Sequence, residues 1–256
     1  MRPTRTKLGF ALAIAVSAVL PLAATAAGTR PVGTIESGAG PGWPRTVSPN
    51  DFVPRVTNPW FPLEPGSVWH YAGFKQGIRQ DDTVRVTLRT KTILSVATTV
   101  VHDVVTVNGR PEEVTDDFYA QDRDGNVWYF GEETEELNAQ GKRTSTEGSF
   151  EAGVDGARPG VLIPGNPTVG KAGRQEYLEG EAEDHFRVLA IKTHVSVSFI
   201  STNGALRTRE WTPLEPGAVD NKFYVRGVGV VREIAVKGPL EKLELLSFKS
   251  GSAVGH

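Results

Sequence analysis

The chain has 256 residues, no cysteine and a formal net charge of −2 at pH 7. The absence of cysteine excludes disulfide bonds, cysteine nucleophiles and zinc–thiolate sites. A signal peptide, predicted below, would remove Arg2, Arg5 and Lys7 and bring the net charge to −5. A negative charge of this size argues against nucleic acid or an anionic membrane surface as the partner.

Residues 1–26 have the pattern of a secretory signal peptide. A basic start is followed by the uncharged residues 8–27, and Ala24-Thr25-Ala26 forms a small-x-small cleavage site. The apolar core is shorter than the roughly 20 residues that a membrane-spanning helix needs, although an uncleaved anchor is the alternative. Because no lipobox cysteine follows, we predict a secreted, extracytoplasmic protein that is neither lipid-anchored nor inserted in a membrane.

The remaining chain divides into a linker and one domain. Residues 27–51 are rich in Gly, Pro, Ser and Thr and are predicted to be a flexible linker, and residues 52–256 a single β-rich domain. In chain order, segments dense in β-branched and aromatic residues predict strands at 67–74, 82–90, 92–107, 111–121, 127–130, 186–200, 205–211, 222–236 and 241–249.

Short turns connect several of these strands. Asn108-Gly109, Asp124-Gly125 and Asn203-Gly204 are dipeptides typical of two-residue hairpin turns. Residues 148–173, rich in Gly and Pro, are predicted to form a long ordered loop. No segment shows helical periodicity, so we predict an all-β, mainly antiparallel fold in which a curved meander sheet forms a barrel or half-barrel around a cavity.

Alternation within the second predicted strand indicates how the sheet is oriented. Val84, Val86 and Leu88 alternate with polar residues, which predicts that these three side chains share the buried face.

Carboxylates are concentrated in two stretches. Ten of the 30 Asp and Glu residues lie between positions 112 and 136, and eight more between 147 and 184. So many like charges repel one another unless they are hydrated on a surface or neutralised by something bound.

Asp122, Asp124 and Asn126 have the spacing of a calcium loop, but Val127 occupies the position of its required glycine, so a hairpin is favoured. Calcium is kept only as a candidate cofactor.

Aromatic residues interleaved with these carboxylates favour a binding site for a small molecule or a glycan. The loop at 148–173 is predicted to cover the mouth of an aromatic cavity with Glu151 and Asp155. The aromatic lining is predicted to come from Trp69, Tyr119, Trp128, Tyr129 and Trp211. The candidate ligand-binding residues are Tyr119, Trp128, Glu132, Glu151, Asp155, Glu176, Asp184, Lys222 and Tyr224.

A second hypothesis is a carboxylate-dependent extracellular hydrolase. Two of the same carboxylates would act as acid and base or nucleophile on a glycosidic bond, and Lys222 or Tyr224 would position the substrate. A third is an envelope interaction module with a hydrated acidic face. No G-x-S-x-G, P-loop or H-E-x-x-H motif is present, and the five histidines lack metal-ligand spacing. The sequence does not decide whether the protein is an enzyme or a binding protein, nor what its oligomeric state is.

Several longer motifs resemble those of a family of uncharacterised secreted bacterial proteins. They are Asn58-Pro59-Trp60-Phe61-Pro62-Leu63, Tyr119-Ala120-Gln121-Asp122 with residues 125–132, residues 151–157, and Arg174-Gln175-Glu176-Tyr177. The resemblance extends over residues 52–246. It implies an exported, ligand-cradling curved sheet and no established activity, so it assigns no catalytic residue.

Overall fold

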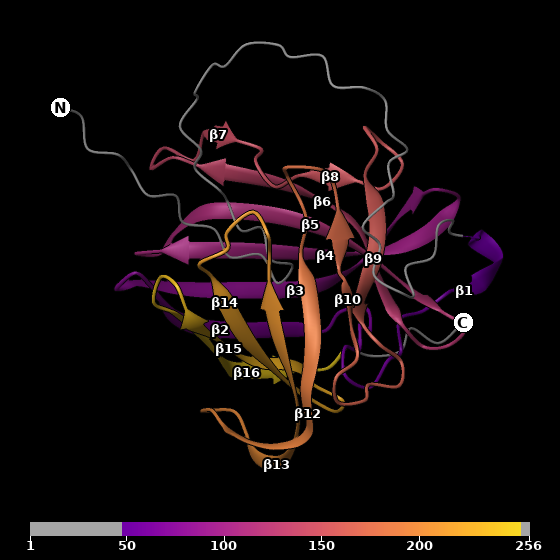
Figure 1. Ribbon diagram of the computed structural model, residues 1–256. Helices are drawn as coiled ribbons and strands as arrows, with labels where there is room; N and C mark the ends of the chain where they lie inside the picture. Colours follow the sequence, from indigo (N-terminus) through magenta and orange to yellow (C-terminus); the bar gives the residue numbers. More distant parts are fainter. Residues whose placement is uncertain (1–47, 252–256) are drawn as a thin grey trace.

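A computed structural model describes residues 48–251, and within them the chain forms β-strands, one 3-10 helix and no α-helix (Figure 1). The predicted signal peptide and nearly all of the predicted linker lie outside this range. No helix in the range is long and apolar enough to cross a membrane. Helix η1 covers Pro49–Asp51, and the strands are β1 (Phe52–Val53), β2 (Val68–Lys75), β3 (Ile78–Ile93), β4 (Val96–Val107), β5 (Arg110–Asp122), β6 (Val127–Leu137), β7 (Arg143–Ser145), β8 (Phe150–Glu151), β9 (Arg158–Ile163), β10 (Ala172–Arg174), β11 (Glu176–Tyr177), β12 (His185–Ser196), β13 (Ser201–Trp211), β14 (Val219–Val225), β15 (Gly229–Lys237) and β16 (Glu241–Lys249).

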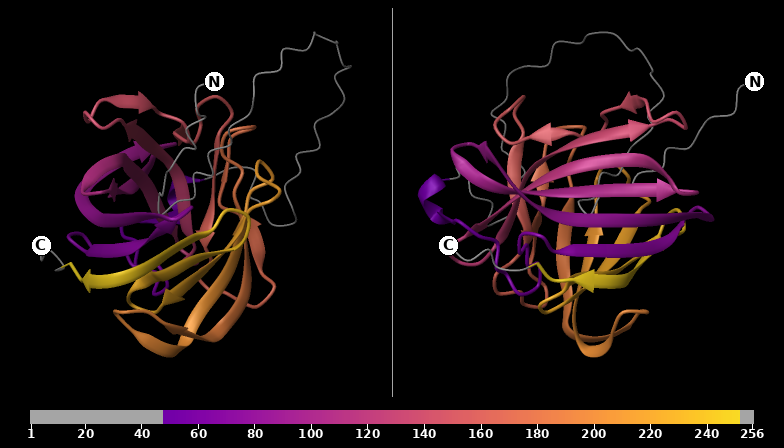
Figure 2. Two further views of the ribbon diagram at one scale, coloured as in Figure 1. Left: turned by 90° about the vertical axis from the view of Figure 1, so that its left-hand side faces the viewer. Right: turned by 180° about the vertical axis from the view of Figure 1, so that it is seen from behind.

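The strands form one antiparallel path that curls into a barrel (Figures 1 and 2). Its order is β10-β12-β13-β14-β15-β16-β2-β3-β4-β5-β6-β9-β11, with β1 added to β5 and with β7 and β8 added to β6. The chain itself crosses the seam, because β10 pairs with β12 on one edge, β11 pairs with β9 on the other, and only Gln175 separates β10 from β11. The predicted all-β antiparallel barrel is therefore confirmed, as a nearly closed barrel with one seam.

Tight hairpins account for the meander. Asn108 and Gly109 have φ angles of 53° and 73°, the pair of positive values that a type I′ turn needs, and they join β4 to β5 as predicted. Gly125 has a φ of 81° in the predicted turn between β5 and β6. Leu94 and Ser95 also have positive φ angles, of 49° and 62°, in a turn between β3 and β4 that neither residue type signals. The prediction of one strand over residues 92–107 is therefore wrong, because β3 ends at Ile93 and β4 begins at Val96.

Three further predictions about local structure are wrong. Asn203-Gly204 lies inside β13, and the turn that precedes this strand falls at residues 197–200. The segment 222–236 is two strands, β14 and β15, which meet at a turn beginning at Arg226. Residues 148–173 are not one long loop, because they contain β8, β9 and the start of β10.

Leu88 does not share the buried face with Val84 and Val86. The pairing of β3 with β4 shifts register between Val86 and Thr90, and this irregularity turns the strand so that Leu88 is 78% exposed. From Val84 toward the start of β3, buried and less buried side chains do alternate, and this alternation places Asp82 and Gln80 on the inner face.

The two ends of the barrel differ in chemistry. At one end, which we call the apolar end, the segment 54–66 packs Trp60, Phe61 and Leu63 into the interior. The backbone N–H of Gly227 donates to Pro59 O at 2.7 Å and ties this segment to the β14–β15 turn. The opposite end, where β2 turns into β3 and β4 into β5, is called the acidic end because of the side chains described below.

A second, smaller apolar cluster lies on the outer side of the sheet. It contains Trp128, Phe130 and Phe118, and Phe52 of β1 covers it with edge contacts to Trp128 and Phe130. Residues of β5 and β6 are therefore buried on both faces, which explains the continuous run of buried positions in β6.

Candidate functional site

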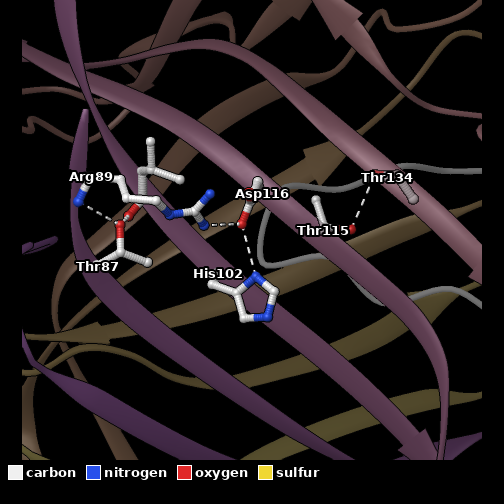
Figure 3. Close-up of polar contacts among 7 residues, drawn as sticks. Thr87, Arg89, His102, Thr115, Asp116 and Thr134 are labelled. Atoms are coloured by element: carbon white, nitrogen blue, oxygen red, sulfur yellow. Dashed lines mark hydrogen bonds and ion pairs between the residues drawn. The ribbon is translucent and has the colours of Figure 1, made fainter. Parts of the chain in front are cut away.

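Polar side chains gather inside the barrel at the acidic end. Successive side chains of a strand point to opposite faces, and in β5 Glu113, Thr115 and Asp117 point inward and are buried. On the inner face, Thr115 Oγ1 lies 3.1 Å from Thr134 Oγ1 of β6. Asp116 lies on the other face of the sheet, and its contacts are separate from this threonine pair (Figure 3).

On the outer face of the sheet, β3, β4 and β5 each contribute one side chain to a surface ion-pair group (Figure 3). Asp116 Oδ1 accepts a hydrogen bond from Arg89 at 2.8 Å and lies 2.8 Å from His102 Nδ1. Partial burial opposes ionisation of Asp116, but the hydrogen bonds from Arg89 and His102 outweigh it and lower the pKa of the carboxyl. Each charge here has an opposite partner, in contrast to the interior.

Carboxylic acids are the main buried polar groups of the described residues, and Lys222 is the one basic side chain buried with them. Charged groups are almost never fully buried unless they are paired, so this imbalance is unusual. Mutual electrostatic effects connect the acids into one network across the barrel. Its members, each at most 7% exposed, are Asp82, Asp103, Glu113, Asp117, Glu132, Glu176, Asp184, Glu210 and Glu233.

Tyr129 joins two of these acids through one hydroxyl group. Its Oη lies 2.8 Å from Asp117 Oδ1 and 2.9 Å from Glu132 Oε2. A phenol has a single proton, so both contacts are hydrogen bonds only if one carboxyl is itself protonated and donates to the Tyr129 oxygen. Burial and the neighbouring acids raise the pKa of both carboxyls well above their usual range, which favours this protonated form.

Lys222 is the centre of a second group of contacts. Its Nζ lies 3.5 Å from Glu210 Oε2 and 3.5 Å from Glu233 Oε2. Burial disfavours the charged amine, but Glu233 and Glu210 outweigh this effect and raise the pKa of Lys222. Glu210 Oε1 also accepts hydrogen bonds from Thr208 at 2.7 Å and Tyr224 at 3.0 Å. This part of the interior is internally satisfied.

Other interior groups are not satisfied. Gln80 is fully buried on β3, and neither its Oε1 nor its Nε2 has a hydrogen-bond partner among the residues that the structure describes. Glu113 Oε1 also has none. Leaving a buried polar group unpaired costs about 1–3 kcal/mol, so such groups in a native protein indicate a bound molecule or ordered water.

Burial keeps much of the network protonated near neutral pH. Desolvation is the largest effect in each case, and it raises the pKa of Glu113 to about 8 and those of Asp82 and Glu233 to about 7. These acids therefore change charge within the physiological pH range and would respond strongly to a positive charge placed beside them.

The structure brings six of the nine predicted site residues together. Tyr119, Glu132, Glu176, Asp184, Lys222 and Tyr224 are all buried, and the electrostatic network of the interior includes each of them. Gln175 N donates to Asp184 O at 2.7 Å, and this bond holds Glu176 and Asp184 side by side across the seam.

The other three predicted residues lie elsewhere. Trp128 belongs to the outer apolar cluster, on the opposite face of the sheet from Tyr119. Glu151 Oε2 forms an ion pair with Lys91 at 2.8 Å, again outside. Asp155 is exposed in a turn with a φ of 50°. The two carboxylates of this segment therefore do not reach the interior acids.

Sequence reasoning missed several interior residues, including Gln80, Asp82 and Asp117. A signal was present: Gln80 and Asp82 precede Val84 at intervals of two, so they occupy the same face as the apolar residues of β3. A carboxylate on the apolar side of an alternating strand could have been marked as interior. Within residues 48–251, no group of three or more His, Asp or Glu side chains is arranged to hold a metal ion, so calcium gains no support from the part described.

Comparisons with known proteins give fold similarity alone. No family model and no curated protein matches the chain, so its resemblance to a family of uncharacterised secreted proteins stays a prediction. One similar solved structure is a candidate exported protein with a YmcC-like fold from Bacteroides fragilis NCTC 9343, with a TM-score of 0.45 and 13% identity over 75% of this chain and 99% of that chain. Another is a candidate lipoprotein from Parabacteroides distasonis ATCC 8503, with a TM-score of 0.42 and 11% identity over 74% of this chain and 98% of that chain. Any function of this chain has to be inferred from its own side chains.

Proposed function

We propose that the chain is an exported binding protein that takes a small ligand with positively charged amino groups into the acidic end of its barrel. The observation that carries this proposal is Gln80, a fully buried amide at the edge of the network of buried acids whose two side-chain polar atoms have no hydrogen-bond partner within residues 48–251. An ammonium group would donate to its Oε1 and to the carboxylates around it.

The charges of the interior favour a cation over a neutral ligand. Glu113 faces the acids Asp103, Glu136 and Asp117, and Lys75 is the one basic group that lowers its pKa appreciably. A bound ammonium would stabilise the ionised forms of these acids, because an opposite charge within a few ångströms favours the charged state. Binding should therefore release protons and should be tighter at pH 8 than at pH 6.

A matched pair of isosteric variants tests the site. Asp117→Asn changes an inward carboxyl, and Asp116→Asn makes the same change one residue away on the outer face. Isothermal titration with putrescine and spermidine, and with a neutral diol as long as putrescine, should show binding of the amines alone. Asp117→Asn should weaken amine binding at least tenfold, and Asp116→Asn should leave it unchanged.

Two results would overturn this function. The first is the failure of the native protein to bind any of these amines at pH 8. The second is equal weakening by both variants, which would mean that the amines are attracted by the overall negative charge. Native mass spectrometry of the protein as purified gives a further check, because a co-purified ligand should carry at least one basic nitrogen.

A further inference from the structure

A basic groove lies on the outer surface, beside the rim of the acidic end. Its volume is about 360 Å³, within the range of small-molecule sites. Its lining includes Arg187 of β12, Arg209 and Trp211 of β13 and Lys237 at the end of β15, and no acidic side chain from residues 48–251 lines it. A concentration of three cations is unexpected on a chain whose net charge is −2.

The two arginines of the groove lie opposite each other on neighbouring strands, and no described residue neutralises their charges. Arg187 and Arg209 are direct partners in the antiparallel pairing of β12 with β13. Like charges directly opposite on one face of a sheet are destabilising. Neither guanidinium makes a hydrogen bond or an ion pair with any residue of the described range, and both side chains are exposed. No donor of either guanidinium group is therefore taken up by the part of the chain that the structure describes.

Neighbouring groups hold the groove in shape. Trp211 stacks on His185 with ring centroids 5.5 Å apart and 14° between the planes, and the guanidinium of Arg209 lies 5.9 Å from the Trp211 ring. On the other wall, Lys237 Nζ reaches Pro216 O at 3.5 Å. A guanidinium next to an aromatic face loses less side-chain freedom when it binds, so Arg209 is partly preorganised.

We propose that this groove binds the phosphate group of a small phosphorylated molecule about the size of a sugar phosphate. Two guanidinium forks match the oxygens of a phosphate, and Lys237 adds a third positive charge. A phosphate monoester carries close to two negative charges at pH 7 and fits three cations better than a single carboxylate does. The site is separate from the interior acids, because β13 points Glu210 inward and Arg209 and Trp211 outward.

Titration calorimetry at low ionic strength tests this site with glucose 6-phosphate, inorganic phosphate, glucuronate and glucose as probes. Glucose 6-phosphate should bind the native protein, and glucose should not. Arg209→Gln and Lys237→Gln should each weaken the binding of glucose 6-phosphate at least tenfold. Arg85→Gln, which removes an exposed arginine from the outer face of β3, is the matched control and should leave the dissociation constant unchanged.

The probes also separate the sources of the phosphate. Equal binding of inorganic phosphate would support the site with free phosphate as its ligand. Glucuronate binding as tightly as glucose 6-phosphate would overturn the assignment to phosphate, and failure of all anions to bind would overturn the site. Equal weakening by Arg85→Gln and Arg209→Gln would show attraction to general surface charge and would also overturn it. Because the altered side chains are exposed, unchanged thermal unfolding is expected and confirms that each variant is folded.

Discussion

Glu113 provides a test of the buried acids that is independent of any ligand. Its carboxyl is 4% exposed inside β5, and it faces Asp103, Lys75, Glu136 and Asp117 from four strands. Burial raises its pKa from the usual 4.5 to about 8 in the folded protein. We expect Glu113→Gln, which replaces the protonated acid by a neutral group of the same shape, to make the stability of the protein less dependent on pH.

The direction follows from where the proton is held. Between pH 4.5 and pH 8 the unfolded chain releases the proton of Glu113, while the folded protein retains it. In that interval the folded protein binds one more proton than the unfolded chain. The free energy of unfolding therefore falls as the pH rises, by roughly 1.4 kcal/mol for each pH unit. Integrated from pH 5 to pH 8, Glu113 lowers the free energy of unfolding by roughly 3.5 kcal/mol, and Glu113→Gln should abolish this contribution.

Urea unfolding at pH 5, 6, 7 and 8, followed by tryptophan fluorescence, measures this difference. Glu112→Gln is the control, because Glu112 is the neighbouring acid and points to the outer face of β5. The native protein and the control should both lose stability steeply toward pH 8, and Glu113→Gln should lose less. A native protein whose stability is flat or rises over this interval would refute the reasoning, as would equal slopes in the two variants.

Three further predictions concern other parts of the barrel. Trp60→Ala should lower the free energy of unfolding by about 3–5 kcal/mol in chemical denaturation, because this 3% exposed side chain fills the apolar end. Gly131→Ala should destabilise by more than about 2 kcal/mol, since a Cβ there would lie 2.2 Å from Phe150 O at a φ of 144°. Gly217→Ala should be nearly neutral by the same assay, because its Cβ would meet no atom of residues 48–251 within 4 Å. Asp116→Asn should lower the free energy of unfolding by at most about 1 kcal/mol at pH 7. This difference should disappear in acid, as the pH falls through the lowered pKa of the native carboxyl and protonates it. A destabilisation that persists in acid would contradict the ion-pair interpretation.

The sequence by itself determined the class of fold. Alternating β-branched residues and Asn108-Gly109 specify antiparallel strands and a type I′ hairpin through local sterics alone. The strand at 241–249 was predicted with the bounds that β16 has. Predictions were wrong where a turn had no local signature, as between Leu94 and Ser95, or where a shift in register changed the facing of Leu88.

The candidate site was decided only by the tertiary structure. The sequence showed that carboxylates are concentrated around Glu132 and Glu176. It did not show that Glu132 lies inside the barrel and Glu151 outside, because that depends on which face of each strand is buried. Asp82 and Glu233 lie far apart in the chain and outside both acidic stretches, and closure of the barrel brings them into one network. A carboxylate has its pKa set by burial and by neighbours in space, and neither quantity is encoded by local composition.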